Sequence, residues 1–92
     1  MLVKFYATFR PVVGGKSAEF DLPEYTSAGV LLAQIVTRFP GLRPLMLDEA
    51  GGLFAHVHMF INGRDVQYLP DGMETPLTTQ DTVDIFPPVA GG

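Results

Sequence analysis

The chain has 92 residues, 47% of them hydrophobic, which is enough for one small domain with a single core. Its net charge is -4, and its six lysines and arginines are spread between Lys4 and Arg64. No basic stripe is therefore available to bind a phosphate backbone, and we expect no nucleic-acid partner. The chain also lacks cysteine, which excludes a disulfide, a thiol nucleophile and a zinc thiolate site.

The N-terminal residues MLVKFYATF contain neither the long apolar segment nor the cleavage site of a signal peptide. No apolar run elsewhere approaches the roughly 18 residues that a membrane-spanning helix needs. We therefore expect a soluble, cytoplasmic protein without a membrane partner.

The first predicted elements form a β-hairpin. In residues 2–9, apolar side chains alternate with others and share one strand face: Val3, Phe5, Ala7 and Phe9. The stretch RPVVGG, residues 10–15, predicts a turn or loop because it contains a proline and paired glycines. In residues 16–22 the alternation returns, and three side chains are directed inward: Ala18, Phe20 and Leu22.

Residues 28–39 predict the main helix, with Thr26 or Ser27 offering a hydroxyl N-cap just before it. Three apolar residues then recur on one helical face: Leu31, Ile35 and Phe39. Pro40 and Gly41 end the helix, and we expect its apolar face to cover the sheet. A shorter helix over residues 44–48, followed by a Gly-Gly loop, is our interpretation of the next segment.

Two more strands and a final one complete the elements. Val57, Met59 and Ile61 alternate with other residues, and Asn62-Gly63 after them is the strongest turn signal in the chain, so a short strand should follow. In TVDIFP, residues 82–87, Val83 and Ile85 share one face and predict the last strand.

This order of elements predicts an α+β domain in which one main helix packs on one face of a mixed sheet. The first and last strands are expected to lie side by side in the middle of that sheet. The chain then divides into a folded body, residues 1–86, and a C-terminal tail, residues 87–92. Fully extended, this tail spans about 20 Å.

The tail has a composition suited to entering another protein. Pro87 and Pro88 hold its base extended, whereas Gly91 and Gly92 have no Cβ and can pass through a narrow, water-excluded pocket. An α-carboxylate becomes a good electrophile only as a mixed anhydride, and adenylation in such a pocket provides one. We expect residues 89–92 to be mobile until they are bound, because they bury too little to offset their ordering entropy.

Several segments resemble the MoaD/ThiS-type sulfur carriers of the ubiquitin-like β-grasp superfamily. They are ATFRPVVGG after the first strand, INGRDV in the later hairpin and TPLTTQDTVDIFPPVAGG at the end. The resemblance covers essentially the whole chain. Its most specific part, FPPVAGG, is similar to the tail of the small subunit of molybdopterin synthase.

The resemblance implies a ubiquitin-like β-grasp fold and a reactive C-terminal glycine. By this likeness, an adenylating enzyme of the MoeB/ThiF type, related to ubiquitin-activating enzymes, uses ATP to activate Gly92, with Gly91 beside it. A sulfur donor then produces a thiocarboxylate, whose sulfur a MoaE-like large synthase subunit uses to make molybdopterin. The chain itself is expected to bind no cofactor and to be catalytically inactive on its own, serving as the sulfur-carrying subunit.

The acceptor pathway stays open at this point. The segment VQYLPDGMETPL, residues 66–77, is long for a molybdopterin synthase small subunit. It resembles carriers that deliver sulfur to cysteine synthesis, or archaeal modifiers that are conjugated to lysines; thiamine synthesis and tRNA thiolation are further routes. A different class, a noncovalent β-grasp binding module with an inert tail, also fits the predicted fold.

Other candidate sites are weaker. GGKS, residues 14–17, lacks the first glycine of a phosphate-binding loop, because Arg10 stands there, and a strand is expected to follow it. His56 and His58 share a strand face, but the sequence supplies no third ligand near them, so we predict no metal site. Scattered acidic residues could steer a basic activating enzyme: Asp48, Glu49, Asp71 and Glu74.

Strand alternation also predicts a docking surface. Tyr6, Phe60 and Phe86 fall opposite the inward-facing sets, so they should be neighbours on the sheet face that the helix leaves bare. Such an aromatic cluster beside a reactive tail is typical of a partner-binding surface. The predicted partner-binding set also includes the residues that follow: Pro87, Pro88 and Val89.

Overall fold

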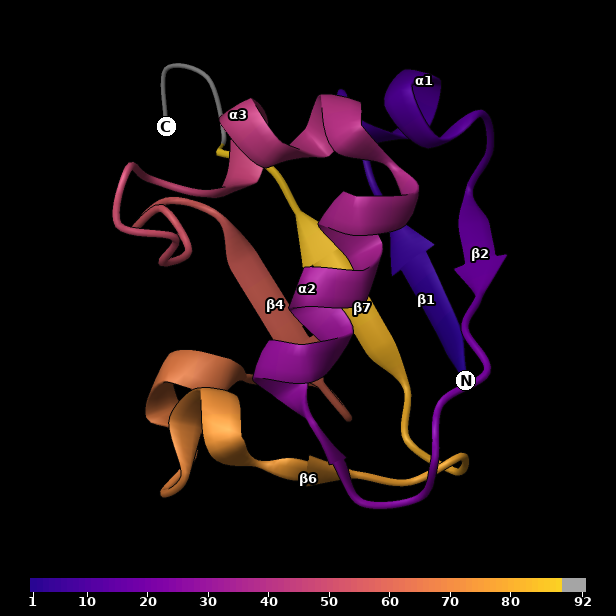
Figure 1. The fold of residues 1–92 in the computed structure, drawn as a ribbon, viewed down its shortest axis with the longest axis vertical. Coiled ribbons are helices and arrows are strands. Elements are labelled where there is room, and N and C mark those ends of the chain that lie inside the picture. Colours follow the sequence, from indigo (N-terminus) through magenta and orange to yellow (C-terminus); the bar gives the residue numbers. More distant parts are fainter. Residues whose placement is uncertain (89–92) are drawn as a thin grey trace.

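The structure is a computed structural model that describes residues 1–88 (Figure 1). Within this range, five strands form one mixed sheet in the order β2-β1-β7-β4-β5. Their bounds are β1 Leu2–Phe5, β2 Ser17–Glu19, β4 His58–Ile61, β5 Arg64–Asp65 and β7 Val83–Phe86. A separate two-stranded sheet pairs β3, Thr26–Ser27, with β6, Pro76–Leu77.

The helical elements are α1 Phe9–Val13, α2 Ala28–Arg38 and α3 Arg43–Met46, together with short 3-10 helices at Pro40–Leu42, Val66–Tyr68 and Gly72–Glu74. Helix α2 lies across one face of the five-stranded sheet, whereas α1 and α3 lie at the end of the molecule where the chain leaves β7 (Figure 1). No helix within residues 1–88 is long and apolar enough to cross a membrane. The predicted arrangement, one main helix on one face of a mixed sheet, is confirmed.

The last strand occupies the middle of the sheet, as predicted. β7 pairs in parallel with β1, with Val83 opposite Val3 and Ile85 opposite Phe5. On its other side β7 pairs antiparallel with β4, where Ile85 lies opposite Met59. Both edges of β7 are therefore hydrogen-bonded, and every second side chain along it faces α2.

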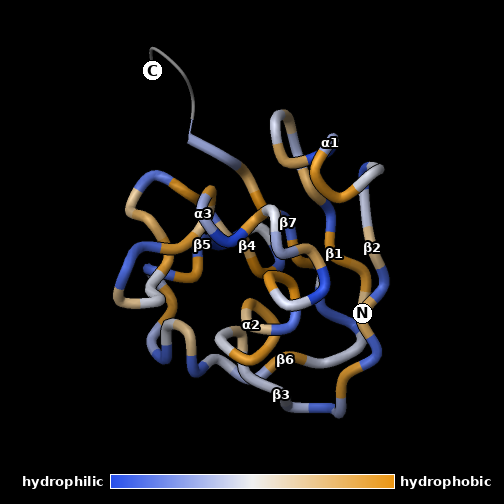
Figure 2. Tube along the Cα trace, turned by 45° about the horizontal axis from the view of Figure 1, so that its top comes forward, coloured by the Kyte–Doolittle hydropathy of each residue, from blue (hydrophilic) through white to orange (hydrophobic). Residues whose placement is uncertain are grey.

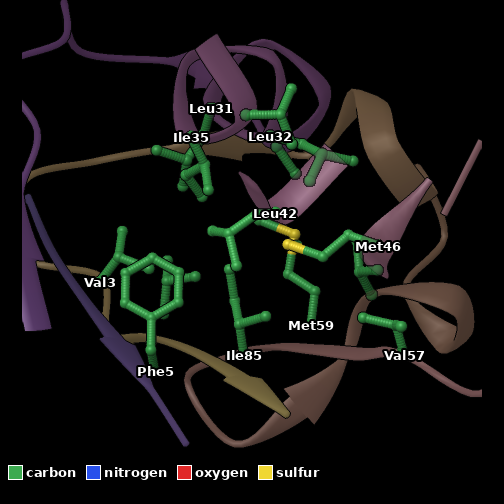
Figure 3. Packing of buried hydrophobic residues seen from close by; sticks show 14 of the residues in the cluster. Val3, Phe5, Leu31, Leu32, Ile35, Leu42, Met46, Val57, Met59 and Ile85 are labelled. Atoms are coloured by element: carbon green, nitrogen blue, oxygen red, sulfur yellow. The ribbon is translucent and has the colours of Figure 1, made fainter. Parts of the chain in front are cut away.

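The core fills the space between α2 and the sheet. Ser27 caps α2, since its Oγ accepts a hydrogen bond from the Val30 amide at 3.2 Å. Figure 3 shows side chains of this helix pointing toward those of the sheet, and all of the following are buried: Leu31, Leu32, Ile35, Val3, Phe5, Met59 and Ile85. Hydrophobic residues concentrate toward the middle of the molecule, and hydrophilic stretches lie mainly on peripheral loops (Figure 2).

The segment after β1 differs from the prediction. The strand ends at Phe5; Ala7, expected to face inward, is exposed and has a φ of 50°. Residues 10–13 of the predicted RPVVGG turn are instead part of α1, and Gly14 caps the C-terminus of this helix in the left-handed conformation with a φ of 79°. Proline is tolerated in the first turn of a helix, where its missing N–H leaves no bond unmade, and Phe9 still reaches the core from this helix.

Other local predictions are correct apart from their boundaries. The short helix expected over residues 44–48 is α3, and the Asn62-Gly63 turn joins β4 to β5 with positive φ angles of 52° and 82°. Leu22 is only half-buried although it was expected inside. The pairing of β3 with β6 was not predicted, because two-residue strands carry no alternation to recognise.

A core substitution tests this packing. Ile85 is fully buried at the centre of the sheet, so Ile85→Ala should lower the free energy of unfolding by about 2 to 5 kcal/mol through lost burial and the cavity left behind. Val30→Ala is the matched control, because Val30 lies on α2 with 48% of its surface exposed and should change stability by less than about 1 kcal/mol. Denaturant unfolding measures both, and equal losses would contradict the assigned core.

Candidate functional site

The sheet face opposite α2 carries three aromatic rings that the strands bring together. The rings of Tyr6 and Phe86 are stacked, with centroids 4.1 Å apart and planes 11° from parallel. Phe60 meets Phe86 edge to face at 5.4 Å and 89°. All three side chains are half-buried. We call these three residues the aromatic cluster.

Strand register explains why the cluster forms. On β7, Asp84 and Phe86 point away from the core because Val83 and Ile85 point into it. Phe60 is opposite Asp84 and so lies on the same face, diagonally across from Phe86. Three segments far apart in the sequence thus supply one continuous aromatic surface.

A groove of about 840 Å³ runs over this surface. It is lined by the aromatic cluster and by Ala7, Thr8, His58, Gly63, Asp84, Pro87 and Pro88. Pro87 is buried and Pro88 is exposed, so the base of the predicted tail forms one part of the groove wall. The remaining predicted site residues, Val89, Gly91 and Gly92, lie outside the described residues, as does the predicted mobility of residues 89–92.

One polar contact ties the cluster to the sheet. The Tyr6 hydroxyl donates a hydrogen bond to Asp84 Oδ1 at 2.7 Å. This hydrogen bond, together with partial burial and the Asp84 charge, raises the pKa of Tyr6, although Arg10 opposes the shift. The Arg10 guanidinium lies 5.2 Å from the Tyr6 ring centroid, and its Nε donates to the Phe5 carbonyl oxygen at 2.9 Å.

A second polar pair stands at the other side of the groove, where His58 Nδ1 lies 2.8 Å from Asp65 Oδ2. Burial alone would raise the pKa of Asp65, but hydrogen bonds from the Gln67 amide, from His58 and from the Gln67 side chain outweigh it and lower that pKa. The sequence analysis did not identify this pair. The two-residue Asn62-Gly63 turn could have revealed it, because it sets Asp65 opposite Phe60 and diagonally from His58.

The weaker candidates do not assemble into sites. His56 is exposed in the turn before β4, so it does not share a site with His58. Among residues 1–88, no three histidines or carboxylates are grouped so that they could hold a metal ion. GGKS runs from the end of α1 directly into β2, without the helix that a phosphate-binding loop needs.

Comparison with known proteins decides the family. The model of the ThiS family matches residues 3–92. The chain belongs to the ThiS family of ubiquitin-like sulfur carriers. This membership confirms the β-grasp fold and the carrier class that the tail and the hairpins indicated.

Three similar proteins illustrate the relationship. Small archaeal modifier protein 3 of Haloferax volcanii is 40% identical over 90 residues, which cover 98% of this chain and 96% of that protein. Sulfur carrier protein CysO of Mycobacterium tuberculosis is 30% identical over 88 residues, with 90% and 88% covered. A chain in the crystal structure of the Amycolatopsis orientalis BexX/CysO complex superposes with a TM-score of 0.80 at 26% identity, covering 99% of this chain and 98% of that one.

Alkaline titration tests the geometry of this ThiS-family groove. The folded state holds the Tyr6 proton more tightly than the unfolded chain does, because the pKa of Tyr6 is raised on folding. The hydrogen bond therefore contributes its full stabilisation of the folded state below the unfolded pKa of about 10. This contribution is lost as pH rises through the folded pKa. The tyrosinate absorbance of the wild type minus that of Tyr6→Phe should therefore show a midpoint above 10. Tyr6→Phe should cost about 0.5 to 1.5 kcal/mol of stability at neutral pH. A difference midpoint at or below 10 would rule out the Tyr6–Asp84 hydrogen bond.

Proposed function

We propose that this chain is a sulfur carrier, or a carrier that also serves as a protein modifier, and that Gly92 is its activated residue. The observation that carries the proposal is that the ThiS-family match extends through Gly92, the last residue. The base of the tail also lines the aromatic groove, so a partner held there would have the reactive end close by.

The proposed chemistry has two balanced steps at the terminal carboxylate. An oxygen of the carboxylate forms a bond to the α-phosphorus of ATP, and pyrophosphate leaves, which produces a mixed anhydride. Hydrosulfide from a sulfide source then attacks the carbonyl carbon, the bond to AMP breaks and AMP leaves, and the resulting thiocarboxylic acid loses its proton, so that one carboxylate oxygen has been replaced by sulfur. ATP is a substrate of the activating partner in this scheme, and this chain supplies the electrophilic carbon.

The described residues would provide docking and direction. The aromatic cluster offers large, rigid apolar rings, the kind of side chain that anchors protein interfaces. Pro87 is buried beside it and Pro88 continues outward, so the chain leaves the sheet from a fixed point. We infer that an adenylating enzyme and a sulfur acceptor bind this groove in turn. The similar CysO chain occurs in a crystal structure with BexX, which supports a partner-dependent role.

The relatives favour the alternative pathways over molybdopterin synthesis. These relatives are named small archaeal modifier protein 3 and sulfur carrier protein CysO, that is, a modifier and a sulfur carrier. The likeness of FPPVAGG to the small subunit of molybdopterin synthase pointed elsewhere, and that finer assignment stays a prediction, as does a cytoplasmic location. Ahead of that route we therefore propose a carrier that delivers sulfur to another acceptor or is conjugated to a protein amine.

Changing the C-terminus tests the activated residue. Incubation with ATP, a ThiF-like activating enzyme and a sulfide source should raise the intact mass by about 16 Da, as oxygen is replaced by sulfur. Deleting Gly92, or adding one alanine after it, should abolish the gain while the unfolding transition stays unchanged, because the last residue of the core cluster among residues 1–88 is Ile85. Thiolation of the untrimmed, extended protein would contradict the proposal, and an unchanged wild-type mass would favour the noncovalent binding module.

Truncating the aromatic cluster tests docking separately. Phe86→Ala and Phe60→Ala should each weaken binding to the activating enzyme by about 1 to 3 kcal/mol, as loss of an interface anchor does. Tyr68→Ala is the matched control, since this aromatic side chain is 77% exposed in the 3-10 helix Val66–Tyr68 and does not line the groove. Calorimetric titration measures the affinities, and wild-type affinity combined with a lowered melting temperature would make the cluster purely structural.

A further inference from the structure

The groove carries one polar atom whose hydrogen-bonding role is fixed by its neighbours. Asp65 remains a carboxylate over the neutral range because its pKa is lowered, and a carboxylate can only accept a hydrogen bond. Nδ1 of His58, 2.8 Å from Asp65 Oδ2, must therefore carry the proton. In the neutral ring Nε2 is then a bare acceptor. Within residues 1–88 no hydrogen bond joins Nε2 to the protein, and the side chain is 38% exposed where it lines the groove.

The surroundings define what could meet this acceptor. Phe60 lies beside His58, with ring centroids 6.1 Å apart. Phe86 lies directly opposite His58 in the β4–β7 register. Both carboxylates near the groove are already engaged, Asp84 by the Tyr6 hydroxyl and Asp65 by His58. An acidic occupant would face these charges and offer no donor to Nε2.

A neutral aromatic group with a hydrogen-bond donor best fits a groove that has aromatic walls and a free Nε2 acceptor. Aromatic and proline walls favour a flat ring, which can stack or meet another ring edge to face. A cationic occupant is disfavoured because Arg10 already lies over the Tyr6 ring and Lys4 is opposite the groove residue Asp84 in the strand register. Neither cation has an ion-pair partner among residues 1–88.

We propose that His58 is a positioning residue that makes the groove selective for a partner side chain with an aromatic ring and an N–H donor, of the indole type. The inference rests on the proposed docking role of the groove. Besides Asp65, the ionisable groups on the surrounding segments are Asp84 of β7, Lys4 of β1, Tyr6 just after β1, Arg10 of α1 and Arg64 of β5.

Two small probes isolate the donor. Indole and 1-methylindole have the same ring system, but only indole has an N–H. Nuclear magnetic resonance titration of the full chain at pH 8 should show both probes shifting Phe60 and Phe86, with indole several-fold tighter.

The variants make the test decisive. His58→Phe keeps a ring and should bind the two probes equally, whereas His56→Phe, which changes the other of the two histidines, should keep the wild-type preference. Equal binding of both probes to the wild type, a preference that survives in His58→Phe, or no shift at the groove with either probe would overturn the inference. The docking proposal fails on a different result, namely wild-type affinity of Phe86→Ala for the activating enzyme, so the two failures are distinguishable.

Discussion

The parallel pairing of β1 with β7 is the constraint on which the rest of the molecule depends. They are the first and last strands of the described residues, and their pairing places β7 between β1 and β4, so that both edges of β7 are hydrogen-bonded. Because side chains alternate along a strand, one short segment serves two purposes. Val83 and Ile85 complete the core beneath α2, and Asp84 and Phe86 complete the groove on the opposite face. A one-residue slip in register would exchange the two sets.

The same alternation explains how much of the site the sequence predicts. The aromatic cluster followed from period-two patterns in three strands, since each strand is long enough to show which side faces inward. The α1 segment did not follow, because Pro11 suits a turn and the first turn of a helix equally well. The positive φ of Ala7 has no signal in the sequence, because alanine rarely adopts it. The backbone conformation of such residues is determined by tertiary contacts rather than by local conformational preference.

The polar pairs of the groove show a further limit of sequence reasoning. Tyr6 with Asp84, and His58 with Asp65, are joined by hydrogen bonds between neighbouring strands. Each pair lets a polar side chain sit among aromatic rings without leaving a buried group unbonded, and residues 1–88 contain no unpaired buried side-chain nitrogen or oxygen. Finding these pairs from sequence requires the strand register, not only the direction of each side chain. Register comes from the short Asn62-Gly63 turn on one side and from the distant β1–β7 pairing on the other.

The geometry also limits what kind of partner could use the terminal glycine. Four residues follow Pro88, and a chain of four residues reaches about 13 Å at most. In the function proposed above, in which Gly92 is activated, a partner bound in the groove must have its active site within about that distance of Pro88. Because Pro87 is buried against the sheet, the chain cannot lengthen this reach by peeling away unless contacts at the end of β7 are lost. An activating enzyme and an acceptor that both use Gly92 would then have to place their active sites at similar positions relative to the aromatic cluster, so one docking surface can serve both in turn but not at the same time.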